Sequence, residues 1–211
     1  MKNTAIADVG ETLVSLLRKE ITAANRLNEV VGVDEKDIVL LPPDAHERHA
    51  NIRLSLFPYA VIESPYLKNE PLKPMNAASL QLPPLSLDVY FLLSAHIATG
   101  GDSDAEMKNA LASDRLLGRA MQIFYDNGVI SGSKLKGNLA GEDLELRVTL
   151  NPVTVEDLTR IWSVFPNLPF RMSICYAVTP VQIESGRSQQ VSRVADKTVG
   201  QDEMVENPET I

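Results

Sequence analysis

The sequence predicts an α+β protein, with a mainly antiparallel four- to five-stranded sheet, helices packed on one face and one long central helix among them. Two patterns favour this fold class. Several segments alternate between apolar and polar residues, which is typical of strands in a sheet with one covered and one solvated face. Between these segments, apolar residues recur at three- and four-residue steps over Asp102–Gly128, which is the period of an amphipathic helix.

The stretch Asp102–Gly128 carries signals for both ends of a helix. Ser103 and Glu106 form an S-x-x-E capping box, which satisfies free backbone groups at a helix start. Asn127 and Gly128 predict a left-handed stop at the far end. A helix of this length spans about 36 Å. We expect the fold to be organised around its apolar face, which consists of Met107, Ala110, Leu111, Leu117, Met121 and Phe124.

Two further helices and five strands are predicted around this stretch. Residues Ala5–Leu27 keep the helical period, and Gly10 is the weak point of that helix. Thr154 begins a short helix with acidic residues in its first turn, and Pro166 ends it. Pro58 favours an edge or a bend at the end of the second strand. The predicted strands are Asp37–Leu41, Asn51–Phe57, Leu85–Leu93, Leu144–Leu150 and Phe170–Val178.

Two segments lack the pattern of a packed element. Five of the thirteen prolines lie between Glu63 and Pro84, which predicts an extended, solvent-facing loop of about 20 residues. From Glu184 onward the chain is polar and has no apolar periodicity. We therefore expect one α+β domain over residues 1–185 and a polar, flexible C-terminal tail over residues 186–211.

Composition limits the classes of function. The chain has 211 residues and a net charge of −8, from 20 basic and 28 acidic side chains, which argues against nucleic-acid binding. The single Cys175 lies within a strand pattern and indicates a packed thiol in a reducing compartment. The first twenty residues lack the continuous apolar segment of a secretory leader, and no stretch is apolar enough to enter a membrane. We therefore expect a cytoplasmic location and no direct membrane insertion.

No catalytic motif stands out. The sequence contains no G-x-S-x-G, G-x-G-x-x-G or Walker-type loop. His46 and His49 suggest a metal site, with Asp44 as a third ligand, but the zinc-peptidase pattern needs one more residue between its histidines. A solvated polar loop is the favoured interpretation of this segment. The sequence thus predicts no enzyme, no cofactor and no metal.

Arg115 and Arg119 lie four residues apart on the predicted long helix, with Asp114 beside them. Two interpretations are equally supported. The three side chains form the solvated face of the helix, or they make an ionic contact with a neighbouring subunit, since arginine suits bidentate pairing at interfaces.

The order of several motifs resembles one known family, the N-terminal domain of tail-terminator or cap proteins of contractile injection systems. The loop Ser64–Pro71 (SPYLKNEP) also resembles that family, and it adds Tyr66 and Lys68 to the candidate subunit interface. The resemblance covers roughly residues 5–185. The motifs that carry it stand at Ile52–Phe57, Pro84–Leu93, Arg115–Phe124 and Leu144–Trp162.

The resemblance implies a structural function. The protein would form a homo-hexameric ring on the last ring of the inner tube, end tube polymerisation and meet the terminal sheath layer. Its implied partners are copies of itself, the inner-tube protein and the sheath protein, with a second cap protein as a further candidate. It would act as part of a particle assembled in the cytoplasm. Two alternatives stay open: a phage tail-completion or neck protein and, less favoured, a small metal-dependent enzyme using His46 and His49.

Overall fold

The structure is a computed structural model that describes residues 3–26, 32–49, 51–67, 71–76, 79–97, 102–166 and 168–190. The chain divides into two compact units. The main unit comprises Met1–Glu70 and Pro84–Glu184, and the small unit comprises Pro71–Pro83 and Ser185–Ile211. No helix among the described residues is both long and apolar enough to span a membrane.

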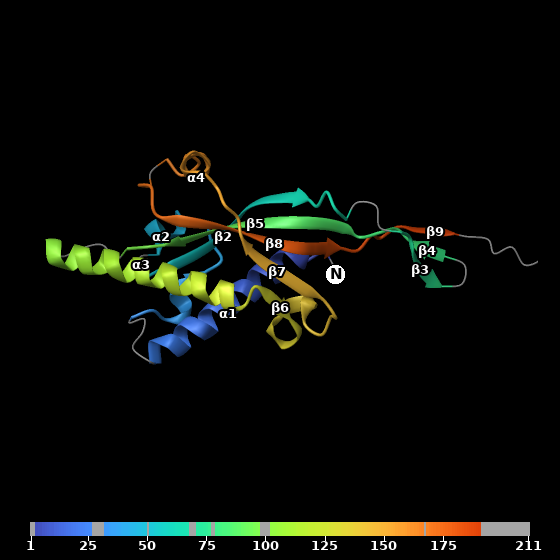
Figure 1. Cartoon of the computed structure of the whole chain (residues 1–211), viewed down its shortest axis with the longest axis horizontal. Coiled ribbons are helices and arrows are strands. Elements are labelled where there is room, and N and C mark those ends of the chain that lie inside the picture. Colours follow the sequence, from blue (N-terminus) through green and yellow to red (C-terminus); the bar gives the residue numbers. More distant parts are fainter. Residues whose placement is uncertain are drawn as a thin grey trace, which may run out of the picture. The chain divides into compact units, whose positions relative to one another are not determined.

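The main unit is built on a mixed sheet of six strands in the order β1-β2-β5-β8-β7-β6 (Figure 1). Every neighbouring pair is antiparallel except β1 and β2, which run parallel. The predicted four- to five-stranded sheet is therefore wrong in its detail, because the edge strand β6 was not predicted and the edge strand β1 runs parallel to its neighbour. The strands are β1 Ile38–Val39, β2 Leu54–Glu63, β5 Leu85–Ala95, β6 Val129–Ser131, β7 Glu145–Leu150 and β8 Ser173–Ile183.

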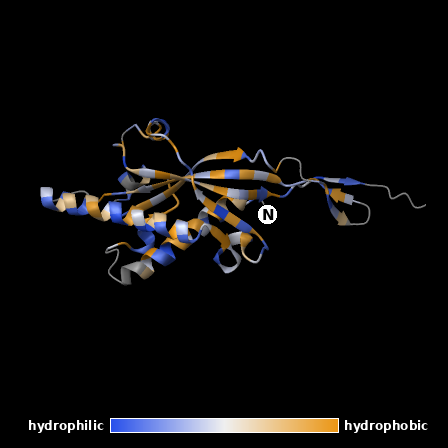
Figure 2. Ribbon diagram, viewed as in Figure 1, coloured by the Kyte–Doolittle hydropathy of each residue, from blue (hydrophilic) through white to orange (hydrophobic). Residues whose placement is uncertain are grey.

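The strands at the centre of the sheet are longer than the sequence predicts. β2 runs through Pro58, because the register shifts between Pro58 and Ala60 and the proline is accommodated at that bulge. β8 likewise continues past Val178 to Ile183 and pairs with β5 along its length. Figure 2 shows hydrophobic and hydrophilic residues alternating along these strands, so each contributes side chains to both faces of the sheet.

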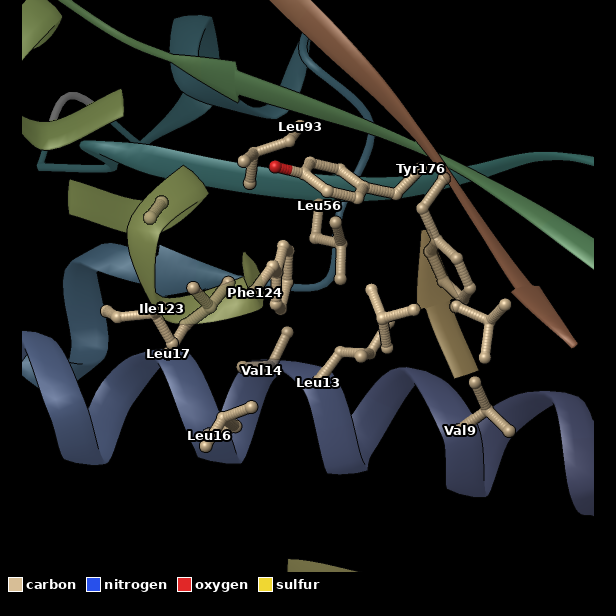
Figure 3. Close-up of a cluster of buried hydrophobic side chains, with 14 of the residues drawn as sticks. Val9, Leu13, Val14, Leu16, Leu17, Leu56, Leu93, Ile123, Phe124 and Tyr176 are labelled. Atoms are coloured by element: carbon tan, nitrogen blue, oxygen red, sulfur yellow. The ribbon is translucent and has the colours of Figure 1, made fainter. Parts of the chain in front are cut away.

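Two long helices cover one face of the sheet, α1 (Ala5–Arg26) and α3 (Ser103–Asp126). Leu13 and Leu17 of α1 meet Phe124 of α3 and strand residues in one cluster (Figure 3). The Phe124 ring packs edge-on against Tyr176 of β8, with ring centres 4.9 Å apart. The buried residues of α1 extend over nearly its whole length: Ala5, Val9, Leu13, Val14, Leu16, Leu17 and Ile21.

The sequence identified the long helix α3 but misjudged its ends. Its N-cap is Asp102, whose side chain accepts a hydrogen bond from the Ala105 backbone N–H at 2.9 Å, and not Ser103. At the other end, Asn127 has a φ of −119°, so the predicted left-handed stop does not form. Instead, the Asn127 side chain donates to the carbonyl of Ile123 at 2.8 Å. The Asn127 side chain therefore satisfies a carbonyl of the last turn, in place of the backbone hydrogen bonds of a glycine turn.

The prediction that α3 is the central helix is also wrong in detail. Its buried residues begin only at Ser113, and Met107 and Leu111, both assigned to its apolar face, are 58% and 47% exposed. In Figure 1 the first turns of α3 extend past the ends of the strands. α1, which packs against β1, β2 and β8, is covered far more completely.

Helices pack on both faces of the sheet, which corrects the prediction of one covered face. The short helix α4 (Val155–Trp162) lies on the side opposite α1 and α3 (Figure 1). Phe165 after α4 packs edge-on against Phe57 of β2, with ring centres 6.0 Å apart. Beneath this layer Leu92 and Cys175 are fully buried. The predicted start of α4 at Thr154 is confirmed by a capping box with Asp157.

Short helical turns link the larger elements. The segment predicted as a polar loop around His46 contains a one-turn helix, α2 (Ala45–Arg48). The described chain also contains three short 3-10 helices: η1 Glu35–Asp37, η2 Gly132–Lys134 and η3 Gly137–Leu139. Near η3, the backbone N–H of Lys136 donates to Thr12 Oγ1 of α1 at 3.0 Å. This contact ties the start of α1 to the segment that follows β6.

The small unit is a three-stranded antiparallel sheet in the order β3-β4-β9. Its strands are β3 Lys73–Asn76, β4 Ser79–Gln81 and β9 Ser188–Gln190. The segment Glu63–Pro84 is therefore not one continuous loop, because β3, with Pro74, occupies an edge, where proline is tolerated. β9 lies in the segment predicted to be an unordered tail, while residues 191–211 lie outside the described part of the chain.

Candidate functional site

The residues predicted for a subunit interface lie on two elements. Asp114 and Arg115 are exposed on α3, and Arg119 is half-buried beside them. Arg119 Nη1 donates to Gln122 Oε1 of the same helix at 2.9 Å. Neither arginine forms an ion pair within the part of the chain that the structure describes. A contact of these two cations with a neighbouring subunit stays a prediction.

Tyr66 lies apart from the arginines, in the turn that follows β2. Its side chain is 91% exposed. Lys68, predicted together with it, lies outside the described residues. An exposed tyrosine supplies a large apolar body with a polar tip, which is the character of many interface residues. The predicted interface set is thus divided between mid-α3 and the end of β2.

An apolar groove of about 740 Å³ lies beside the last turns of α3, and sequence reasoning missed it. Tyr125 at its rim is 88% exposed, and Val129 and Leu150 are about half exposed. Arg147 is the one charged residue among the described residues that line it. The lining consists of Met121, Gln122, Phe124, Tyr125, Gly128, Val129, Arg147, Val148, Thr149, Leu150 and Tyr176.

The groove exists because β6 is shorter than its neighbour β7. β6 pairs only with Glu145–Arg147, and the next contact is the hydrogen bond from the Val148 N–H to the Gly128 carbonyl at 2.9 Å. The residues before Gly128 belong to α3 and the turn after it, so no strand of the described chain pairs with the end of β7 on this side. Leu150, at the end of the predicted strand Leu144–Leu150, is 55% exposed, and no sequence pattern distinguishes it from the buried Leu146 and Val148 of the same strand.

The structure describes no metal centre around His46 and His49. His49 is exposed and caps the end of α2, whereas the side chain of His46 lies outside what the structure describes. Within the described residues, no three His, Cys, Asp or Glu side chains gather closely enough to hold a metal ion. The third histidine, His96, is buried, and its Nε2 lies 2.8 Å from Ser55 Oγ. It is a hydrogen-bonded histidine of the core.

Cys175 is a packed thiol, as predicted. Its side chain is 1% exposed and lies beneath the α4 layer. Burial raises the pKa of the Cys175 thiol, although a hydrogen bond with Tyr59 opposes this shift. Burial also raises the pKa of Tyr59, whose hydroxyl accepts a hydrogen bond from Asn151 Nδ2 at 3.4 Å. A protonated and enclosed thiol is a poor nucleophile.

Solved structures of two particle components share this fold. The first is a PVC sheath/tube terminator of an extracellular contractile injection system, in the extended state, with 16% identity and a TM-score of 0.61 over 95% of this chain. The second is the tube-terminating cap of the anti-feeding prophage, with 18% identity and a TM-score of 0.57 over 92% of this chain. The chain spans 64% and 61% of the length of these two proteins.

Both solved relatives are structural components of particles rather than enzymes. No curated protein matches the sequence. The family comparison, by contrast, matches residues 8–197, which include α1 from Asp8 onward, all of α3 and all six strands of the main sheet. This range confirms the resemblance that the order of the motifs predicts. The chain belongs to the Pvc16 N-terminal domain family.

Proposed function

We propose that this chain is part of a protein that terminates the inner tube of a contractile injection system. Its membership of the Pvc16 N-terminal domain family carries the proposal. The fold supports it, because the two solved relatives are a sheath/tube terminator and a tube-terminating cap. In this role the protein forms a six-fold ring on the last ring of the tube, stops tube growth and meets the terminal sheath layer.

The surface of the main unit is suited to assembly with other proteins. Large apolar side chains are exposed on several separate elements, including Tyr66 after β2, Met107 on α3 and Phe170 before β8. Exposed apolar residues that gather in patches mark protein–protein contacts. Exposed apolar side chains on several separate elements fit a subunit that contacts more than one neighbour, as a ring on a tube end requires.

The proposal is tested in cells that assemble the particle without this protein. We expect tubes of irregular length that lack a defined terminal ring in negative-stain electron micrographs. Supplying the natural full-length protein restores uniform ends, and antibody labelling places it at one end of the particle. Normal tube lengths and ends in the deletion strain would contradict the proposal.

A matched control addresses the alternative of a metal-dependent enzyme. The full-length protein with His46→Ala and His49→Ala together should restore uniform ends as well as the unaltered protein does, since neither histidine has a structural task in the proposed function. Purified protein is analysed for metal in parallel. Loss of rescue together with loss of a bound metal would favour the metal-site hypothesis over this one.

A further inference from the structure

The start of α3 carries exposed apolar side chains that no other element of the described chain covers. No residue from Ser103 to Ala112 is buried, whereas the later turns of the same helix lie in the core. Met107 and Leu111 are four residues apart, so their side chains lie next to each other on one face of the helix. Figure 2 shows that hydrophobic residues recur along α3 into these first turns. We call Asp102–Ala112 the α3 overhang.

The apolar groove described above lies at the opposite end of the same helix. Its volume of about 740 Å³ is within the range of pockets that enclose a ligand-sized group, about 300–1,000 Å³. Its rim is apolar, with Tyr125, Val129 and Leu150 exposed to solvent. Unlike a flat surface patch, it offers walls on two sides, one from α3 and one from the uncovered end of β7.

The overhang and the groove have complementary charges. The overhang carries Asp102, Asp104 and Glu106 against one cation, Lys108. The only charge on the described lining of the groove is Arg147, which has no ion-pair partner among the described residues. An acidic, apolar-edged helix therefore matches an apolar groove with a free cation, and complementary charges at a contact favour one partner and one orientation.

One copy cannot fill its own groove. The Met107–Leu111 pair and the groove-lining residues Met121–Tyr125 lie on one helix, separated by about 21 Å at 1.5 Å per residue. A contact between two different surfaces of identical subunits is heterologous, so each copy binds the next and the chain of contacts closes into a ring when the rotation allows. A contact that pairs identical surfaces would instead stop at a dimer.

We propose that the α3 overhang of one copy docks into the apolar groove of the next copy, with Met107 and Leu111 entering the groove and the acidic residues facing Arg147. The contact rests on the proposed function, because it supplies the subunit interface of the ring. It assigns a role to apolar residues that lie in solvent in the single chain.

The first experiment substitutes the two surfaces in the natural full-length protein and measures self-association by analytical ultracentrifugation. Leu111→Asp on the overhang and Leu150→Asp at the groove should each weaken self-association at least about tenfold, as expected for central apolar contacts. Val164→Asp is the matched control, because Val164 is 66% exposed and belongs to neither surface. Thermal melts establish that all three variants fold.

The second experiment tests the pairing directly. Arg147→Glu and Glu106→Arg should each weaken self-association, and the two changes in one protein should restore it towards the unaltered level. The double variant Met107→Cys, Val129→Cys should form disulfides between copies and give a ladder of linked subunits on a non-reducing gel. The double variant Met107→Cys, Val164→Cys should give no ladder.

The outcomes separate this contact from the function on which it rests. A folded Leu111→Asp variant that associates like the unaltered protein, or a protein that stays monomeric at every concentration, would overturn the contact. If tube ends are nevertheless normal with Leu111→Asp, the tube-terminating function stands and another interface builds the ring. If the Met107–Val129 ladder forms while the deletion strain has normal tubes, the contact stands and the proposed function fails.

Discussion

The two long helices of the main unit are alike in sequence and different in burial. Both α1 and α3 are amphipathic over more than twenty residues. α1 is buried from Ala5 to Ile21, whereas α3 is buried only from Ser113 onward. An apolar stripe in the sequence therefore predicts that one face of a helix packs against something, but it does not predict what covers that face. For α1 the partner is the sheet, and for the first turns of α3 the same chain supplies none among its described residues.

The surroundings of α1 explain why its apolar face is buried along nearly the whole helix. Gly10, which has the lowest helix propensity in this segment, lets the backbone approach Leu40, the residue after β1. A Cβ atom at Gly10 would lie 2.6 Å from Leu40 Cδ2. The segment around η3 contacts the start of the helix, where Asn138 Nδ2 donates to Thr4 Oγ1 at 3.0 Å. α3 packs against α1, β5 and β7, and its buried residues lie only from Ser113 onward.

The largest effect is expected from core leucines in either helix. Leu17→Ala in α1 and Leu117→Ala in α3 should each lower the free energy of unfolding by about 2–5 kcal/mol, since both side chains are buried and their removal leaves a cavity. Denaturant titrations measure this, with the exposed Lys19→Ala as the control. A loss at Leu117 below that at Lys19 would show that α3 contributes nothing to the core.

A smaller loss is expected where η3 packs against the start of α1. Gly137 has a φ of 60°, and a Cβ atom added there would overlap the carboxylate of Asp8. Gly137→Ala should therefore lower the free energy of unfolding by about 1–3 kcal/mol. Gly141→Ala is the control, because its φ is also positive but its Cβ would meet open space. Equal losses in both variants would mean that backbone strain alone accounts for the effect.

The overhang is expected to contribute little to the stability of a single chain. Leu111→Ala should change the free energy of unfolding by less than about 0.5 kcal/mol, the range of exposed substitutions. Its counterpart Leu117→Ala, on the same helix, is the internal standard. A loss of 2 kcal/mol or more at Leu111, about the cost of a buried leucine, would remove the difference between the two halves of α3.

The smallest effect on folding is expected at the arginines of α3. Arg119→Ala should leave the free energy of unfolding within about 0.5 kcal/mol, because its hydrogen bond to Gln122 lies on the exposed surface of the same helix. If Arg115 and Arg119 contact a neighbouring subunit, either alanine variant should weaken ring formation measured by mass photometry. A variant as unstable as Leu117→Ala would place Arg119 in the core instead.

Much of the fold could be read from local patterns. Alternation along Leu85–Leu93 identified the central strand β5, and the helical period of Ala5–Leu27 identified α1, because both signals depend only on which residues face one side of an element. The capping box at Thr154 likewise depends on residues three apart in the chain. The order of the motifs was also sufficient to indicate the family.

The remaining features depend on contacts between distant segments. β1, with two residues, is a strand only because it pairs with β2, and β9 only because it pairs with β4. The sequence by itself determined which faces of the helices and strands are apolar, since that follows from the spacing of side chains along one element. Only the tertiary structure decided which of those faces are covered. Leu117 is buried and Leu111 is exposed, although the sequence pattern assigned both to the apolar face of α3.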